Sequence, residues 1–212
     1  MDQANEIPSF FCVPDITGFT KLIANADINF TKEIIPEVLR KLIDNNILKM
    51  NVAEIEGDAI FFYRTGRLPT ITRVIQQCIL FYDTFSKYIQ SLQKVDEKNY
   101  NKHLSGGQLG LKIIIHYGQI NTSFIKGRTK LIGQDVIIVH KLLKNSIPDM
   151  EYILFTKNYL KRIKTSRDNP LFDWKNLKKG KEVYEFIGTV KYRYIKLDTI
   201  KHSLSPDASQ LI

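Results

Sequence analysis

The chain has 212 residues, of which 43% are hydrophobic, with 31 Lys or Arg and 22 Asp or Glu. This is enough to bury one sizeable core and too little for two ordinary domains, so we expect a single domain over residues 1–212, with a core of about 9–198 and a flexible tail over 199–212. No segment has the roughly 20 apolar residues of a membrane-spanning helix and the N-terminus lacks a secretory pattern, so we expect a cytoplasmic protein without a membrane partner.

The formal net charge of +9 raises the question of a polyanionic partner, because positive charge attracts phosphate. The basic residues of the C-terminal third do not form one block but are spread along the chain: Lys157, Lys161, Arg162, Lys164, Arg167, Lys175, Lys178, Lys179 and Lys181. This spacing favours a solvated basic face over a nucleic-acid partner. A small polyanion such as a nucleoside triphosphate needs only a few well-placed cations.

The first half of the chain predicts a strand, a helix and a hairpin. Residues 9–13 are apolar and β-prone, and Pro14 suits the end of a buried strand. Apolar residues at helical spacing predict a helix over 31–50 that starts near Thr31. Residues 52–55 and 59–63 are two short β-like runs around Glu56-Gly57-Asp58, which predicts an antiparallel hairpin.

The second half continues with a long amphipathic helix over about 70–92, followed by a polar, glycine-containing surface connection over 93–110, the segment expected to be most mobile. The remaining predicted elements are a strand pair over 111–116 and 119–125, a helix over 136–143, a strand over 152–155, a helix capped by Thr156, and a hairpin over 182–186 and 190–197 whose second arm has the pattern of an edge strand. Helices alternate with hairpin-joined strands, so the predicted fold class is α+β with a mixed or antiparallel sheet covered by helices.

Two acidic residues stand where a metal centre could be built. Asp15 follows the first predicted strand and Asp58 lies in the turn of the first hairpin. Taken singly, Asp15 can be explained as a helix cap and Asp58 as a residue of a hairpin turn. If the two strands are neighbours, both carboxylates meet at one edge and offer the hard oxygen ligands that magnesium prefers. Cys12 and Cys78 lie in apolar stretches and are expected to be reduced core residues.

The letters around these aspartates resemble the catalytic domains of class III adenylyl and guanylyl cyclases, over most of the chain. Val-Pro-Asp-Ile-Thr-Gly-Phe-Thr at 13–20 is similar to the first metal motif of that superfamily, and Glu-Ile-Glu-Gly-Asp-Ala at 54–59 to the second. Leu-Lys-Ile-Ile-Ile-His-Tyr-Gly at 111–118 and Ile132-Gly133 with Val136 are supporting matches. The sequence looks closest to a bacterial branch of stand-alone cyclase-like domains.

The resemblance implies a ferredoxin-like cyclase sandwich that works as a homodimer on a nucleoside triphosphate, with Mg²⁺ or Mn²⁺. It also implies roles for individual residues: metal ligation by Asp15, the Ile16 carbonyl and Asp58, base contacts by Glu54 and Lys130, phosphate contacts by Gly18, Phe19, Thr20, Lys179 and Lys181, and a catalytic role for Lys141. Glu54 disfavours ATP, because a carboxylate accepts hydrogen bonds from guanine and the N1 of adenine only accepts, so guanine or a pyrimidine is expected ahead of adenine. Lys130 fits neither standard pattern of base specificity.

Three positions depart from the pattern of the active enzymes. Ile137 replaces an asparagine that orients the ribose, Lys141 replaces an arginine, and a further phosphate-binding arginine would align near Tyr152. Three functions stay open on the sequence: an active cyclase, a degenerate nucleotide-binding signalling module, and a basic nucleic-acid-associated module. Of the histidines, His116 on an apolar strand is expected to be a hydrogen-bonded core residue, and the same interpretation is applied to His140.

Overall fold

Strand β1 (Ile7–Thr17) forms the middle of the sheet and pairs antiparallel with a neighbour on each side. In the computed structural model, which describes residues 6–163 and 174–203, every residue from Ser9 to Ile16 is buried. The predicted end at Pro14 was wrong. Pro14 lacks an N–H, but the pairing with β3 resumes with Asp15 opposite Ala59, and the pairing with β4 continues through Pro14 to Asp15 opposite Lys112.

The sheet is mixed, and only the contact between β4 and β6 is parallel. Its order is β2-β3-β1-β4-β6-β8-β7, with β5 paired to the far end of β4. The strands are β2 (Asn51–Glu56), β3 (Ala59–Thr65), β4 (Gly110–Ile125), β5 (Arg128–Ile132), β6 (Tyr152–Thr156), β7 (Lys178–Tyr184) and β8 (Gly188–Lys196). The predicted fold class, α+β with a mixed sheet covered by helices, is confirmed.

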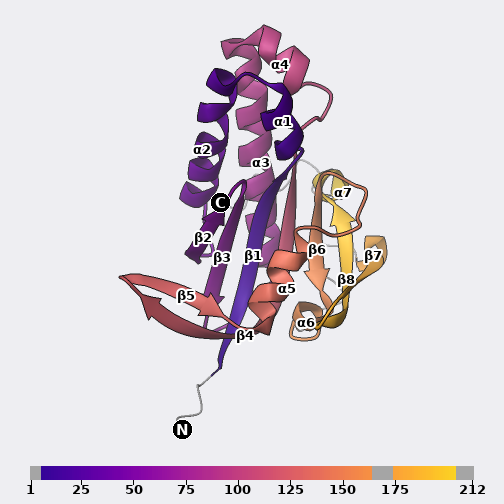
Figure 1. Cartoon of the computed structure of the whole chain (residues 1–212). Helices are drawn as coiled ribbons and strands as arrows, with labels where there is room; N and C mark the ends of the chain where they lie inside the picture. Colours follow the sequence, from indigo (N-terminus) through magenta and orange to yellow (C-terminus); the bar gives the residue numbers. More distant parts are fainter. Residues whose placement is uncertain (1–5, 164–173, 204–212) are drawn as a thin grey trace.

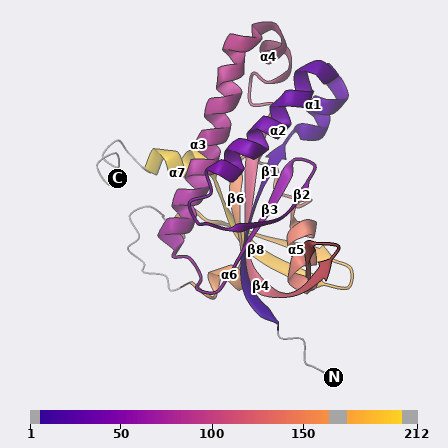
Figure 2. The same ribbon diagram turned by 90° about the vertical axis from the view of Figure 1, so that its left-hand side faces the viewer.

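Helices cover both faces of the sheet (Figure 2). The face under α2 (Ile28–Asp44) and α3 (Ile71–Val95) holds one apolar cluster, to which Phe10, Phe62 and Phe155 belong. The face under α5 (Gln134–Leu142) holds a second cluster. Helix α2 starts before the predicted Thr31, because the Asp27 side chain caps it by accepting from the Asn29 N–H.

The prediction of a mobile connection over 93–110 was wrong. Helix α3 runs on to Val95, and α4 (Glu97–His103) follows, capped by the Asp96 side chain. His103 and Leu104 are buried, so this segment is part of the packed structure, next to α1 (Phe19–Asn25) at one end of the molecule (Figure 1). The other short helices are α6 (Lys157–Leu160), η1 (Trp174–Asn176) and α7 (Leu197–Ser203).

Strand β4 is continuous where a strand pair was predicted. It runs for 16 residues through Tyr117 and Gly118, and its far half pairs with β5 to form an arm that projects from the side of the molecule (Figure 1). Lys126 and Gly127, both with positive φ, make the turn of this arm. The edge-strand reading of β8 was also wrong, because β8 pairs with β6 and with β7, and β7 lies at the edge.

Cys12 and Cys78 are buried and unbridged in the core. Within the described ranges, no helix has the length and apolar character needed to cross a membrane. Lys164 and Arg167 of the basic stretch, and residues 204–212 of the predicted tail, lie outside the described residues.

Candidate active site

Asp15 and Asp58 lie side by side, as the hairpin and the neighbouring strand predicted. Asp15 is in β1, opposite Ala59 of β3, and Asp58 is in the turn that leads into β3. The Ile16 N–H lies 3.4 Å from the Asp58 carbonyl oxygen, which joins the two segments, and the two carboxyl groups are hydrogen-bonded to each other. Asp15 is only 7% exposed. The fold therefore creates a partly enclosed carboxylate pair.

Lys112 of β4 is the cation of this site. Its Nζ lies 2.8 Å from Asp15 Oδ2 and donates to the Leu143 carbonyl, at 2.7 Å, just after α5. Sequence reasoning missed Lys112. The available signal was a lone charge inside an otherwise apolar strand, because a half-buried ammonium requires an acidic partner nearby.

The pKa of Asp58 is raised to about 7, first because the group is partly buried and then because of the charge and hydrogen bond of Asp15. Two adjacent carboxylates that share a proton can exchange it for a divalent cation, so this oxygen donor set fits Mg²⁺ or Mn²⁺. Within residues 6–163 and 174–203, no group of three or more His, Cys, Asp or Glu is arranged for a metal ion. Main-chain and substrate oxygens would complete the coordination.

The turn after β1 carries the next predicted residues, Gly18, Phe19 and Thr20. Gly18 has φ +87°, and a Cβ there would lie 2.2 Å from the Gln108 carbonyl oxygen, so glycine is required. Phe19 and Thr20 start α1 directly after it. The buried Thr17 hydroxyl has no hydrogen-bond partner in the described structure.

A second cluster of charges joins β2, β5 and α5. Lys130 Nζ lies 2.8 Å from Glu54 Oε2, and His140 Nε2 lies 3.0 Å from Glu54 Oε1. Burial alone would raise the pKa of Glu54, but the hydrogen bonds and charges of Lys130 and His140 outweigh it and lower the pKa. The two predicted base-contacting residues are therefore brought together.

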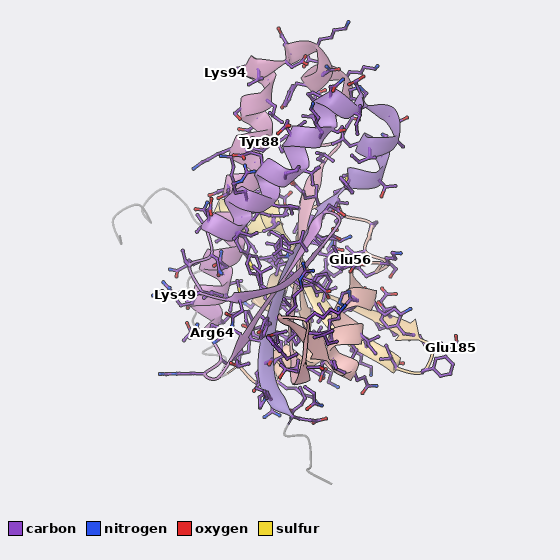
Figure 3. The ribbon with its side chains drawn as sticks, turned by 60° about the vertical axis from the view of Figure 1, so that its left-hand side comes forward. Lys49, Glu56, Arg64, Tyr88, Lys94 and Glu185 are labelled. Atoms are coloured by element: carbon purple, nitrogen blue, oxygen red, sulfur yellow. The ribbon has the colours of Figure 1, made fainter. Side chains whose placement is uncertain are left out.

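His140 is not a core residue like His116. Its Nδ1 lies 3.0 Å from Glu56 Oε2, and its ring stacks on Phe61 with centroids 4.0 Å apart. Figure 3 shows Glu56 beside α5, which carries His140. Because carboxylates only accept, both contacts of His140 are hydrogen bonds when both ring nitrogens carry a proton.

His116 is a satisfied core residue, as predicted. It is 1% exposed, and its ring nitrogens lie 2.8 Å from the Thr156 hydroxyl and 2.8 Å from Asp135 Oδ1. Asp135 also accepts from the Gln119 N–H, at 2.7 Å. Burial would raise the pKa of Asp135, but these hydrogen bonds lower it.

The remaining predicted residues are dispersed. Ile137 and Lys141 are exposed on α5, and Tyr152 is buried, with its hydroxyl bonded to Asn145. The register of β7 places Lys179 and Lys181 opposite Arg193 and Lys191, on the sheet face under α3, whereas Asp15 lies on the α5 face. The phosphate contacts predicted for Lys179 and Lys181 are not supported by their position within one protomer.

This architecture is that of the class III adenylyl and guanylyl cyclase catalytic domains. The adenylyl cyclase CyaB from P. aeruginosa superposes with a TM-score of 0.54 at 12% identity, over 91% of this chain and 95% of that chain. The guanylyl cyclase Cya2 gives 0.58 at 12% identity over 91% and 93%. The guanylate cyclase domain of RhGC from Catenaria anguillulae, solved in complex with GTP, gives 0.56 at 13% identity over 91% and 98%.

The sequence comparisons then define the family. The chain belongs to the family described as "Protein of unknown function (DUF2652)", whose model matches residues 35–152. It is 29% identical over 107 residues to "Uncharacterized protein Rv2561/Rv2562" of Mycobacterium tuberculosis (strain ATCC 25618 / H37Rv). The match covers 50% of this chain, and it spans about half the length, 50%, of that relative.

Proposed function

We propose that the chain is a cytoplasmic nucleotidyl cyclase that converts a nucleoside triphosphate into a 3′,5′-cyclic nucleotide and pyrophosphate in a homodimer. The observation that carries this proposal is the contact between Asp15 and Asp58 at the end of β1, on a cyclase fold. The adjacent Lys112 adds a positive charge for an anionic substrate.

In this reaction the ribose 3′-oxygen forms a bond to the α-phosphorus, and the bond from that phosphorus to the bridging oxygen of the β-phosphate breaks. The hydroxyl proton goes to solvent. Mg²⁺ or Mn²⁺ held by Asp15, Asp58 and the Ile16 carbonyl would make the hydroxyl more acidic and neutralise charge on the phosphates. Asp58 must first lose its proton, and its pKa of about 7 places this loss near neutral pH.

Lys112 has a second role in this proposal. Its ammonium is shared between Asp15 and the Leu143 carbonyl, both at the edge of the site. With Asp15 bound to a cation, the Lys112 ammonium would be available to hold the negative charge of the departing pyrophosphate. A positive group placed where negative charge develops lowers the barrier of phosphoryl transfer.

Glu54 and Lys130 are the proposed base-contacting residues, and guanine is the preferred base. The pair offers an acceptor and a donor side by side. Guanine presents the matching groups, N1–H and its amino group to Glu54 and O6 to Lys130. Each carboxylate oxygen keeps a free lone pair for this, even with Lys130 and His140 bonded to it.

The homodimer is supported by an apolar surface beside the site. Glu54 of β2 is joined to Lys130 of β5 and to His140 of α5, so these three elements are contiguous. Exposed large apolar side chains on α5 and the arm are Ile137, Ile132, Phe124 and Ile125. Val52 and Ile55 of β2 are exposed as well, but they pair with Phe62 and Ile60 and therefore point to the sheet face under α2 and α3. Phe124 is 76% exposed. A second copy of the chain would cover this surface and complete each site.

A non-catalytic nucleotide-binding module is the second candidate, because Ile137 and Lys141 are the groups that α5 offers at this surface. Isoleucine cannot hydrogen-bond, and lysine lacks the planar fork of arginine. Loss of one transition-state donor lowers the rate by about a hundred- to a thousandfold.

Incubation with ATP, GTP, CTP or UTP and either Mg²⁺ or Mn²⁺, followed by mass detection of cyclic products, tests the proposal. We expect a cyclic product from the wild type and none from the Asp15→Ala, Asp58→Ala double variant. The exposed Asp44→Asn variant is the matched control and should keep the activity. Triphosphate binding without product supports the second candidate, and absence of both rejects the two.

A further inference from the structure

The β7–β8 hairpin carries a cationic face. Residues directly opposite each other in an antiparallel pair share a face, and here Lys179 faces Arg193 and Lys181 faces Lys191. The neighbouring residues point the other way, since Lys178 lies over the Tyr194 ring and Gly180 lies against Tyr192. Two pairs of like charges therefore stand side by side, an arrangement that destabilises a strand pair.

Within the described structure, none of these four cations has an acidic partner. Three other strand lysines differ, because Lys112, Lys130 and Lys196 each form an ion pair, whereas Lys178 lies over the Tyr194 ring. Glu182 lies on the opposite face, where it accepts from Ser146 and Tyr192. Since no acidic side chain of residues 6–163 and 174–203 pairs with them, these cations present a net positive charge that attracts an anionic partner.

Helix α6 extends the cationic face. Tyr159 of α6 is buried in the cluster under α3, which places α6 on the same side of the sheet. Its neighbours Lys157 and Lys161 are exposed, and Lys157 directly follows Thr156, which pairs with Tyr192. The positive surface therefore crosses from β7 over β8 to α6.

The outer end of the hairpin is apolar and open. Val183 is 71% exposed on the cationic face, two residues from Lys181, and Phe186 in the turn is 94% exposed. Figure 3 shows the neighbouring Glu185 at the tip, pointing away from the rest of the molecule. A lipid surface is apolar inside and carries charged phosphates outside. A tip with a large exposed apolar residue, followed by a row of cations, has the same order of polarity.

We propose that this face docks the chain on an anionic phospholipid bilayer, with Phe186 and Val183 in the interfacial region and the cations on the lipid phosphates. A nucleic acid fits less well, because single strands are bound by ring faces set among the cations. Here the tyrosines Tyr192 and Tyr194 of β8 belong to the opposite face, and Tyr192 is buried. The inference is independent of the cyclase proposal and concerns a surface contact, not a spanning segment.

Sedimentation of the full chain with phosphatidylcholine vesicles, with and without phosphatidylserine, tests the proposal. We expect binding only when phosphatidylserine is present, and weaker binding as salt is raised, since salt screens exposed charges. The Lys181→Glu, Lys191→Glu variant should lose at least about tenfold in partition coefficient, and Phe186→Ser a smaller amount. The Asp15→Ala, Asp58→Ala variant should bind vesicles like the wild type, whatever its activity.

The matched control is the Lys32→Glu, Lys87→Glu variant, which makes the same charge change at exposed positions of α2 and α3. Thermal melting checks that the variants are folded. Equal binding to both kinds of vesicle, or an equal loss in the control, overturns the proposal. So does a result in which an oligonucleotide displaces the wild type from the vesicles and its own binding is lost in Lys181→Glu, Lys191→Glu, because the face then belongs to nucleic acid.

Discussion

At the scale of single residues, Asp58 links protonation to stability. Its pKa in the folded chain is about 7, against about 3.9 for an unperturbed aspartate. Between these values the folded state holds a proton that the unfolded state has released, so stability falls as pH rises through this window. The cause is the burial of Asp58 beside Asp15, which makes a second negative charge unfavourable.

The Asp58→Asn variant should remove this dependence. In EDTA, we expect the melting temperature of the variant to exceed that of the wild type by an amount that grows from pH 5 to pH 8, because only the wild type must ionise. Calorimetric melts at several pH values measure it. Asp44→Asn, at an exposed position, is the control. A constant difference across the range would contradict the assignment of this pKa.

His140 gives a second residue-scale prediction. Its ring stacks on Phe61 and bonds Glu54 and Glu56, so His140→Ala should reduce the free energy of unfolding by about 1–2 kcal/mol. His140→Phe keeps the stacking and should recover a large part of the loss. Urea denaturation of the three proteins measures it. Equal losses in both variants would mean that the ring contact contributes nothing.

Sequence reasoning reached some of these residues and not others. The nearness of Asp15 and Asp58 was predicted on the condition that the first strand and the hairpin are neighbours, and β1 does pair with β3. The contacts of Lys112 and His140 did not, because they depend on which strand lies next to β1 and how α5 crosses the sheet. Neither the neighbour of a strand nor the way a helix crosses the sheet can be predicted from the periodicity of apolar residues.

At the scale of elements, Gly118 decides the course of β4. A Cβ at this position would lie 2.0 Å from Cγ of Asp135, whose carboxylate bridges His116 and the Gln119 N–H. The bare backbone of β4 therefore lets the start of α5 pack directly on the strand. The sequence suggested a break at Tyr117-Gly118, because glycine usually marks a turn, whereas here it marks a close approach.

Gly118→Ala should therefore destabilise the chain by about 1–3 kcal/mol through overpacking. In the Gly118→Ala, Asp135→Gly double variant all the clashing side-chain atoms of Asp135 are absent, so the combined loss should be smaller than the sum of the two single losses. Guanidinium denaturation of the wild type, the two single variants and the double variant gives the coupling free energy between the two substitutions. Strictly additive losses would show that the methyl group and the carboxylate do not meet.

The prediction of a mobile connection over 93–110 failed for a different physical reason. This segment reads as polar, but Asp96 caps α4, and His103, Leu104 and Leu109 supply buried contacts. The inward residues are spaced too widely for a local pattern to reveal them. Helices α2 and α3, with continuous apolar stripes, were predicted correctly apart from their ends.

At the scale of the whole molecule, the arm formed by β4 and β5 should govern self-association. Phe124 and Ile125 are exposed at its end, so Phe124→Ser, Ile125→Ser should weaken the proposed homodimer by at least tenfold in dissociation constant. Sedimentation velocity over a concentration series measures this. Phe186→Ser makes the same phenylalanine-to-serine change at an exposed position of the β7–β8 hairpin, and should leave the dimer unchanged.

The overall fold was available from the sequence mainly through motif resemblance. Periodicity alone gave an α+β class, but the order of the strands was not derivable, since helices intervene between β1 and β2, between β3 and β4 and between β5 and β6. The parallel contact between β4 and β6 is the clearest example, because the whole of α5 lies between these two strands in the sequence.

One unbroken strand, β4, carries both Lys112 at the carboxylate pair and Phe124 at the end of the arm. Twelve residue steps along a strand span about 40 Å, and a paired strand hardly stretches. The length of β4 therefore fixes the distance between the carboxylate pair and a partner bound at the end of the arm. Removing two residues from the arm would draw a bound partner in by about 7 Å with every side chain on its original side. Removing one would turn the arm over, so that Ile125, which points to the side opposite Phe124, changes places with it.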